Sequence, residues 1–266
     1  MENIENLKEE WPKPNFELGD EPHFLFLISQ PYGGSTAIAQ ILNTCQNSMF
    51  LHERAEGQWL IPGLCKEDRW KENKKINLQS IKAVWLNKYQ SIKMHVGEID
   101  VVIEKSPPNM MRIREICSQF KKSSIIACNR DPYANCSSIL KSQFTSYENN
   151  YKERENIIVG LTKNWQMRSK KIIELIENLF IPFFTYEDFC QKPSILKKHL
   201  KLPRRLESTI NINSKIKVKS YPIQKISNQN ERQISELTKG DIELISSILE
   251  EKPELINFFK YKLRKI

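Results

Sequence analysis

The chain has 266 residues, and 39% of them are hydrophobic, which fits a globular protein and excludes a disordered one. Lysine and arginine number 41 against 32 aspartates and glutamates, so the formal net charge is +9. This balance favours anionic partners such as nucleotides, nucleic acid, sulfated or phosphorylated substrates and membrane surfaces. A lysine-rich composition with solvated side chains explains the charge equally well.

Residues 1–22 are polar and contain three prolines, so we expect an extended arm followed by one α/β domain over 23–266. The arm has no apolar core of a secretory signal, and the apolar run Phe24–Ile28 is too short to span a bilayer. The six cysteines form no CxxC pair, and the four histidines have no metal-ligand spacing. We therefore expect a cytoplasmic protein with reduced thiols, no membrane span and no metal.

Short continuous apolar runs predict buried parallel strands. They lie at Phe24–Ser29, Val101–Ile103, Ser124–Cys128 and Ile181–Thr185, with a shorter apolar segment at Met49–Leu51. Apolar residues at helical spacing predict helices that begin after residue 34 and cover 76–94, 110–120, 132–140, 154–179, 241–250 and 254–263. Residues 57–73 and 203–233 are expected to be irregular.

This alternation of strands and helices predicts a central parallel sheet flanked by helices. Polar segments follow the predicted strands at 30–36, 104–108, 129–131 and 185–188. Because ligands bind at the carboxyl ends of such strands, these segments are expected to form a single site.

The first of these segments, Pro31-Tyr32-Gly33-Gly34-Ser35-Thr36, is built like a phosphate-binding loop. Gly33 and Gly34 let the backbone curl, so that successive N–H groups converge on an anion at the start of a helix. Ser35 and Thr36 add hydroxyl donors. No lysine precedes Ser35, which excludes the GxxxxGK[ST] pattern and a metal-bound triphosphate. A glycine turn that serves packing alone is the alternative.

Five motifs, in order, resemble the sulfotransferases that use 3′-phosphoadenosine 5′-phosphosulfate (PAPS), and are closest to the bacterial and carbohydrate-acting branch. Arg130 and Ser138, with Pro132 between them, resemble that family's 3′-phosphate motif. The other matches are "QPYGGSTAIAQIL", "IEKSPPNMMRI", "PFFTYEDFCQKP" and "YPIQKISNQNERQISELT". The resemblance covers about residues 24–250 and implies a P-loop NTPase-like sulfotransferase fold.

The resemblance also implies how the donor is held. The 5′-phosphosulfate would contact Tyr32, Gly33, Gly34, Ser35 and Thr36. The 3′-phosphate would contact Arg130, by a charge-assisted fork, and Ser138. Tyr186 or Thr185 would lie near the adenine, and Arg232, Lys225 and Asn228 would contact phosphates. The alternatives are a surface ion pair for Arg130, a helix-face hydroxyl for Ser138 and a core role for Tyr186; Trp165 is expected in the core.

The resemblance likewise implies the catalytic groups. Lys105 would face the transferring sulfuryl group, and Glu104 is a possible partner for it; a solvated lysine is the alternative. The proton acceptor is expected to be Glu53, with His52 second, because both follow the Met49–Leu51 segment. A helix N-terminal acid and a packed polar histidine are the alternatives for these two. His95 is expected to be structural.

The expected function is transfer of a sulfuryl group from PAPS to an acceptor hydroxyl on a carbohydrate or small molecule. Tyr32 stands where the family usually has lysine or arginine, so a weak or inactive PAPS-binding module, or one for the product adenosine 3′,5′-bisphosphate (PAP), is a second hypothesis. A nucleotide kinase-like P-loop protein is a third. A nucleic-acid binder is weaker still, because the basic residues are dispersed. Residues 54–95 and 141–156 are expected on the acceptor side; the acceptor and the oligomeric state do not follow from the sequence.

Overall fold

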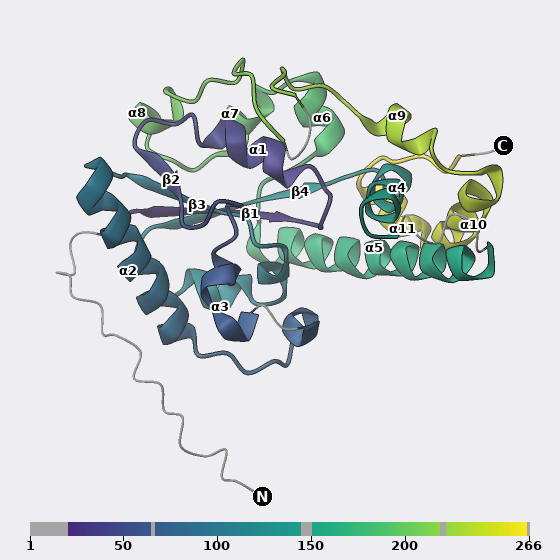
Figure 1. The fold of residues 1–266 in the computed structure, drawn as a ribbon, viewed down its shortest axis with the longest axis horizontal. Helices are drawn as coiled ribbons and strands as arrows, with labels where there is room; N and C mark the ends of the chain where they lie inside the picture. The colour runs from purple at the N-terminus through teal and green to yellow at the C-terminus, as the bar shows by residue number, and fades with distance from the viewer. Residues whose placement is uncertain (1–20, 65–66, 145–150, 219–221, 265–266) are drawn as a thin grey trace, which may run out of the picture.

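The computed structural model describes residues 21–64, 67–144, 151–218 and 222–264. Within these residues a five-stranded sheet is surrounded by helices (Figure 1). The strands are β1 (His23–Ser29), β2 (Ser48–Phe50), β3 (Val101–Glu104), β4 (Ser123–Asn129) and β5 (Phe183–Thr185). The α-helices are α1 (Ser35–Leu42), α2 (Leu78–Val96), α3 (Ile113–Cys117), α4 (Pro132–Gln143), α5 (Tyr151–Leu179), α6 (Tyr186–Gln191), α7 (Ile195–His199), α8 (Arg204–Glu207), α9 (Asn230–Ile234), α10 (Lys239–Glu250) and α11 (Pro253–Phe258). Short 3₁₀-helices form η2 (Gly57–Leu60), η3 (Pro62–Leu64), η4 (Glu67–Trp70) and η5 (Pro107–Met111).

All neighbouring strands run parallel, in the order β2-β3-β1-β4-β5. The chain leaves the central strand β1 toward β2, whereas it leaves the adjacent strand β4 toward β5 on the other side. The strand order therefore reverses between the carboxyl ends of β1 and β4. In open α/β sheets, this reversal opens a crevice in which ligands bind.

The side chains of β1 alternate between two apolar cores on the two faces of the sheet. Phe24, Phe26 and Ile28 pack toward α2 and α3, and Leu25 and Leu27 pack toward α1, α6 and α7. Figure 1 shows these helices on opposite sides of the sheet. Burial on both faces explains why the strand is a continuous apolar run rather than an alternating one.

A third core lies beside the sheet, where α4, α5, α10 and α11 pack together (Figure 1). Trp165 of α5 is fully buried there, and its indole N–H donates to the carbonyl of Arg130 at 2.9 Å. The expected core position of Trp165 is thus confirmed. This contact also fixes the middle of α5 against the end of β4.

The expected parallel α/β architecture is confirmed, with some differences in the elements. The segment at Met49–Leu51 contributes a fifth strand, β2, at the edge of the sheet. The predicted helix at 110–120 is a 3₁₀-helix that begins at two prolines, followed by the short α3. The expectation of an irregular 203–233 is wrong in two places, since α8 lies within it and α9 begins within it. Both are too short for helical periodicity to show.

Most of the expected N-terminal arm, residues 1–20, lies outside the described residues. Glu21, near its end, is buried against the domain, where its carboxylate accepts from the backbone N–H of Lys121 at 2.9 Å. It also forms an ion pair with Lys82 at 2.7 Å. Among the described residues, no helix is both long and apolar enough to cross a lipid bilayer.

Candidate active site

The loop after β1 forms the left-handed turn that its glycines predict. Gly34 caps α1 with φ of +84°, and Tyr32 also has a positive φ of +59°. A Cβ on Gly34 would lie 2.2 Å from Cδ2 of Tyr186, so only glycine fits between the loop and that ring. The N–H groups of Ser35 and Thr36 lie in the first turn of α1, where helix geometry provides no intrahelical acceptor. This loop can therefore present several N–H groups to one anion.

Arg130, directly after β4, is only 5% exposed. Its Nη1 donates to the carbonyl of Tyr32 at 3.1 Å. Its Nε and Nη2 donate to Oδ1 of Asn230 at 2.9 and 2.8 Å, and Nη2 also donates to Oε1 of Gln233. Amide oxygens of α9 thus occupy donors that match phosphate oxygens in geometry.

The ring of Tyr186 joins these two parts of the site. Cζ of Arg130 lies 4.3 Å from the ring centroid, and Gly34 packs against the same ring. Tyr186 begins α6, which is fixed at its start by a capping box between Thr185 and Asp188. Burial raises the pKa of the Tyr186 phenol, whose hydroxyl donates to the carbonyl of Ser227 at 3.3 Å. Gly34 and Arg130 therefore lie against the same aromatic ring.

Ser138 lies on a stripe of α4 that faces the glycine loop. One turn before it, Asn135 donates to the carbonyl of Pro31 at 2.8 Å. One turn after it, Oγ of Ser142 is 2.6 Å from the Tyr32 hydroxyl. Among the described residues, the buried Oγ of Ser138 has no hydrogen-bond partner. A buried hydroxyl without a partner indicates a position for a ligand or water oxygen.

Lys105, at the end of β3, is 4% exposed, and its Nζ lies 2.7 Å from Oε1 of Glu56. The expected partnership of Glu104 with Lys105 is wrong, because neighbouring residues of a strand point to opposite sides. The backbone N–H of Lys105 donates to the carbonyl of Ala55 at 2.9 Å. A buried ion pair thus lies at the carboxyl end of β3, the strand beside β1.

The carboxylate of Glu104 holds the surrounding backbone instead. It accepts from the N–H of Gly57 at 2.6 Å, the N–H of Ser106 at 2.8 Å and the side-chain amide of Asn109 at 3.2 Å. Burial raises the pKa of Glu104 to about 7, although these hydrogen bonds oppose the shift. Glu104 therefore fixes the segment that carries Glu56 beside the segment that carries Lys105.

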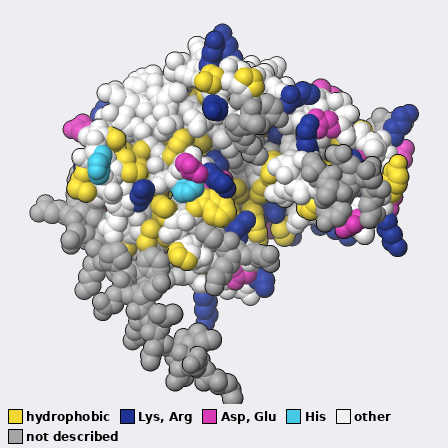
Figure 2. Space-filling view, in the orientation of Figure 1, with side chains coloured by type: hydrophobic (Ala, Val, Ile, Leu, Met, Phe, Trp, Pro, Cys, Tyr) yellow, Lys and Arg dark blue, Asp and Glu magenta, His cyan; other side chains and the backbone are white. Residues whose placement is uncertain are grey.

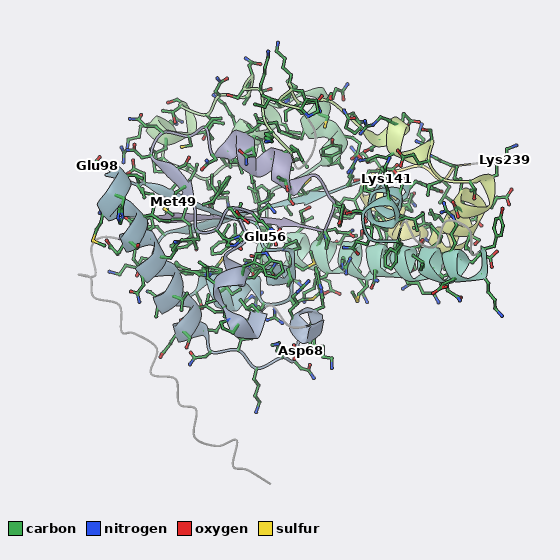
Figure 3. All side chains as sticks on the ribbon, in the orientation of Figure 1. Met49, Glu56, Asp68, Glu98, Lys141 and Lys239 are labelled. Atoms are coloured by element: carbon green, nitrogen blue, oxygen red, sulfur yellow. The ribbon has the colours of Figure 1, made fainter. Side chains whose placement is uncertain are left out.

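Glu56 accepts two further hydrogen bonds on Oε2, from Nε2 of Gln58 at 2.7 Å and from Nε1 of Trp59 at 3.0 Å. Burial alone would raise the pKa of Glu56, but the charge of Lys105 and these donors outweigh it, and the pKa is lowered. The carboxylate is consequently ionised at neutral pH. Figure 2 shows acidic, basic and histidine side chains gathered among hydrophobic ones near the middle of this face, where Figure 3 labels Glu56.

The two residues expected as proton acceptors precede Glu56 closely in the chain. Glu53 is exposed, and His52 is half-buried, with its Nδ1 accepting from the N–H of Arg54 at 3.3 Å. Sequence reasoning missed Glu56, which follows a left-handed residue, Ala55, and precedes a 3₁₀-helix. No local motif marks it. The signal that could have found it is the need of a buried lysine for an acidic partner.

Arg232, Lys225 and Asn228 are exposed, in or before α9. The α9 side chains that contact Arg130 are Asn230 and Gln233. Glu187 supports this arrangement, because its carboxylate accepts from the backbone N–H of Asp131 at 3.1 Å and from Nδ2 of Asn230 at 2.5 Å.

No known family model matches the chain, and no curated protein matches it. Solved structures do match. Sulfotransferase STF9 from Mycobacterium avium gives a TM-score of 0.54 at 13% identity, over 92% of this chain and 79% of that chain. A sulfotransferase from Alicyclobacillus acidocaldarius gives 0.53 at 11% identity, over 91% and 97% of the two chains. The expected sulfotransferase fold is therefore confirmed.

Proposed function

We propose that this chain, which has the sulfotransferase fold, transfers a sulfuryl group from PAPS to an acceptor hydroxyl. The observation that carries the proposal is the contact of both Gly34 and Arg130 with the ring of Tyr186, together with the ion pair between Lys105, which directly follows the neighbouring strand β3, and Glu56. It supports a donor with anionic groups at both ends, placed beside a catalytic ion pair.

The donor side fits an adenosine bisphosphate by its chemistry. We assign the loop of Tyr32, Gly33, Gly34, Ser35 and Thr36 to the 5′ end, because its glycine geometry and helix start favour an anion.

The 3′-phosphate goes to the guanidinium of Arg130 and the unpartnered hydroxyl of Ser138. We place Tyr186 beside the nucleotide and the exposed Arg232 near its phosphates. The amide oxygens of Asn230 and Gln233 stand where phosphate oxygens would bind, so α9 must release Arg130 when the nucleotide enters.

When bound, the donor supplies an activated sulfuryl group. The Nζ of Lys105 places a positive charge where negative charge develops during transfer. We propose that the ionised carboxylate of Glu56, which Lys105 orients, accepts the proton of the acceptor hydroxyl during transfer. Glu53 and His52 are the alternative acceptors for this proton.

One observation favours a second function, a module that binds the nucleotide without transfer. Tyr32 brings no cation to the loop, and its hydroxyl contacts Ser142 of α4 at 2.6 Å. If the protein does transfer the sulfuryl group, Lys105 must supply the positive charge that a lysine or arginine in the loop would otherwise provide. Tight binding of PAP with no release from PAPS would identify such a module.

Thermal unfolding with added nucleotides tests the donor assignment. PAP at about 100 times its Kd is expected to stabilise the chain by about 2.7 kcal/mol. The Arg130→Ala variant is expected to lose this stabilisation. A larger shift with ATP or GTP plus magnesium would instead support a kinase-like protein and contradict the proposal.

A substitution series decides the proton acceptor. Release of PAP from PAPS is measured, in the presence of hydroxyl acceptors, for Glu56→Gln, Glu53→Gln and His52→Ala. We expect a drop of about 100-fold for Glu56→Gln alone, the usual size for loss of a general base. An equal drop in Glu53→Gln or His52→Ala, with Glu56→Gln active, would reassign the role.

We also propose that the protein is cytoplasmic. This compartment keeps thiols reduced, which fits free cysteines such as the buried Cys128 and Cys136.

A further inference from the structure

An exposed indole lies directly beside the Lys105–Glu56 pair. Trp59 of η2 is 38% exposed, although large aromatic side chains are usually buried. Its Nε1 donates to Oε2 of Glu56 at 3.0 Å, which fixes the ring next to the ionised carboxylate. A flat apolar surface of this kind suits a ring of a bound molecule.

Two guanidinium groups flank this indole. Cζ of Arg54 lies 5.6 Å from the Trp59 ring centroid, and Cζ of Arg69 lies 5.9 Å from it. Arg54 is exposed, whereas Arg69 lies in η4. Both contacts are cation–π contacts, made by the face of the planar guanidinium rather than by its N–H edge.

A third guanidinium adds to the positive charge. Arg168 of α5 lies over Trp70, with Cζ 4.3 Å from the ring centroid. Burial, and then repulsion from Arg69, lower the pKa of Arg168 to about 10. Its Nε is buried with no hydrogen-bond partner among the described residues. Holding like charges close together in a desolvated place is unfavourable unless an anion joins them.

Nearby carboxylates are engaged with lysines. Glu56 pairs with Lys105 at 2.7 Å, and Glu72 pairs with Lys171 at 2.6 Å. Asp68 is bound by Lys74. Among the described residues, three arginine side chains thus lie around Trp59 and Trp70, where three carboxylates each contact a lysine.

The segment that carries Arg69 and Trp70 is fixed in place from inside the protein. Arg112 donates to the carbonyls of Arg69 at 3.0 Å, Lys71 at 2.7 Å and Pro108 at 3.3 Å. One buried guanidinium thereby joins η4 to η5, the element that follows Lys105. The backbone that carries Arg69 and Trp70 is thus held beside η5.

We propose that the acceptor is itself an acid: a hydroxyl-bearing ring compound whose carboxylate binds between Arg54, Arg69 and Arg168 while its ring lies on Trp59. This inference rests on the proposed function, because it names the substrate class of the same site. A sugar acid and a phenolic acid share the required chemistry. Both carry a hydroxyl and a carboxylate on one ring compound.

Binding of matched acid and neutral compounds tests the inference without turnover. The full chain saturated with PAP is titrated calorimetrically at low salt. The sugar arm compares 4-nitrophenyl β-glucuronide with 4-nitrophenyl β-glucoside, and the phenol arm compares 4-hydroxyphenylacetate with its amide. We expect the acid to bind about tenfold tighter than its neutral counterpart in at least one arm, a difference of about 1.4 kcal/mol.

Charge-removing variants then locate the preference. Arg54→Gln and Arg168→Met are each expected to reduce the preference for the acid to under about threefold, since each removes one charge-assisted contact. Lys170→Gln is the matched control, because Lys170 is an exposed cation on the same helix as Arg168. Arg54 is exposed, so its variant tests the inference even if Arg168→Met does not fold.

Equal binding of acid and neutral compounds in both arms would overturn the inference, as would a preference that survives both arginine variants. Failure of the proposed function gives a different result. In that case PAP does not bind, and the same titrations on the nucleotide-free chain report the acid preference alone.

Discussion

The two halves of the candidate site are built in different ways. The half around Gly34 and Arg130 consists of strand ends, a helix start and a single aromatic wall, Tyr186. The half around Glu56 and Lys105 consists of 3₁₀-helices held together by buried side chains, above all Glu104 and Arg112. Backbone geometry forms the first half, and side-chain contacts between distant segments form the second.

This difference teaches where change is tolerated. A loop whose N–H groups bind an anion works only with the right backbone conformation, so its sequence is constrained locally. A surface made of side chains on irregular segments can change its charges without moving a strand. We therefore expect substitutions in one half to leave binding by the other half largely intact.

The largest expected effect separates catalysis from donor binding. Under the proposed function, Lys105→Met removes the charge assigned to the transferring group, so the release of PAP from PAPS is expected to fall by about 100- to 1000-fold. PAP should still bind, because Lys105 contacts Glu56 rather than the glycine loop. Loss of both properties would contradict the separation of the two halves.

That substitution also leaves the carboxylate of Glu56 without its cation, which is destabilising. Lys105→Met combined with Glu56→Gln serves as the control. We expect it to recover stability in denaturant unfolding without recovering transfer.

The second prediction concerns the pH dependence of stability through Glu104. Its pKa is raised by burial from 4.5 to about 7 in the folded chain. Between those pH values the folded state binds more protons than the unfolded state, so the free energy of unfolding falls as pH rises, by at most about 3 kcal/mol.

Glu104→Gln is expected to reduce this slope, measured by urea unfolding from pH 4.5 to 8. The variant is also less stable at every pH, because an amide N–H₂ then faces the N–H donors of Gly57 or Ser106. The test is decided by the slope of the free energy of unfolding against pH, and not by the loss of stability common to all pH values. Burial also raises the pKa of Asp131 to about 6, so a smaller slope of the same sign remains. An unchanged slope would show that Glu104 is already ionised below pH 7.

A matched pair of glycine substitutions tests the backbone-built half. Gly34→Ala places a Cβ 2.2 Å from Tyr186 at a positive φ, and is expected to cost about 2 kcal/mol of stability and most of the PAP affinity. Gly160→Ala, in α5 with no atom within 4 Å of the new Cβ, is expected to gain about 0.5 kcal/mol. Thermal unfolding and PAP titration measure both. Normal PAP binding by Gly34→Ala would remove the loop from the site.

The smallest predicted effects concern the planar guanidinium of Arg130 and its N–H donors. Arg130→Lys keeps a charge but loses the planar fork, so PAP affinity is expected to fall by about tenfold. Gln233→Ala removes an acceptor that competes for Nη2, and is expected to raise the affinity by about threefold. Calorimetric titration with PAP measures both changes. Weaker binding by Gln233→Ala would show that α9 holds the nucleotide rather than competing with it.

The half of the site that is built from backbone geometry could be predicted from the sequence better than the half that is built from side-chain contacts. The β1 run and the turn at Gly34 are local patterns, and the structure contains both of them. The partner of Lys105 could not be predicted, because Glu56 lies 49 residues earlier in a segment without periodicity. Helix α9 is five residues long and buries only two of them, so its sequence carries little helical signal.

Under the proposed function, the contact between α9 and Arg130 has a consequence for turnover. A buried guanidinium that loses a phosphate must otherwise wait for water to enter a narrow space before the product can leave. Asn230 and Gln233 offer amide oxygens as replacements, so the departing nucleotide is exchanged for groups of the same chain. The product can thus be displaced from within, and the emptied site keeps its shape for the next donor.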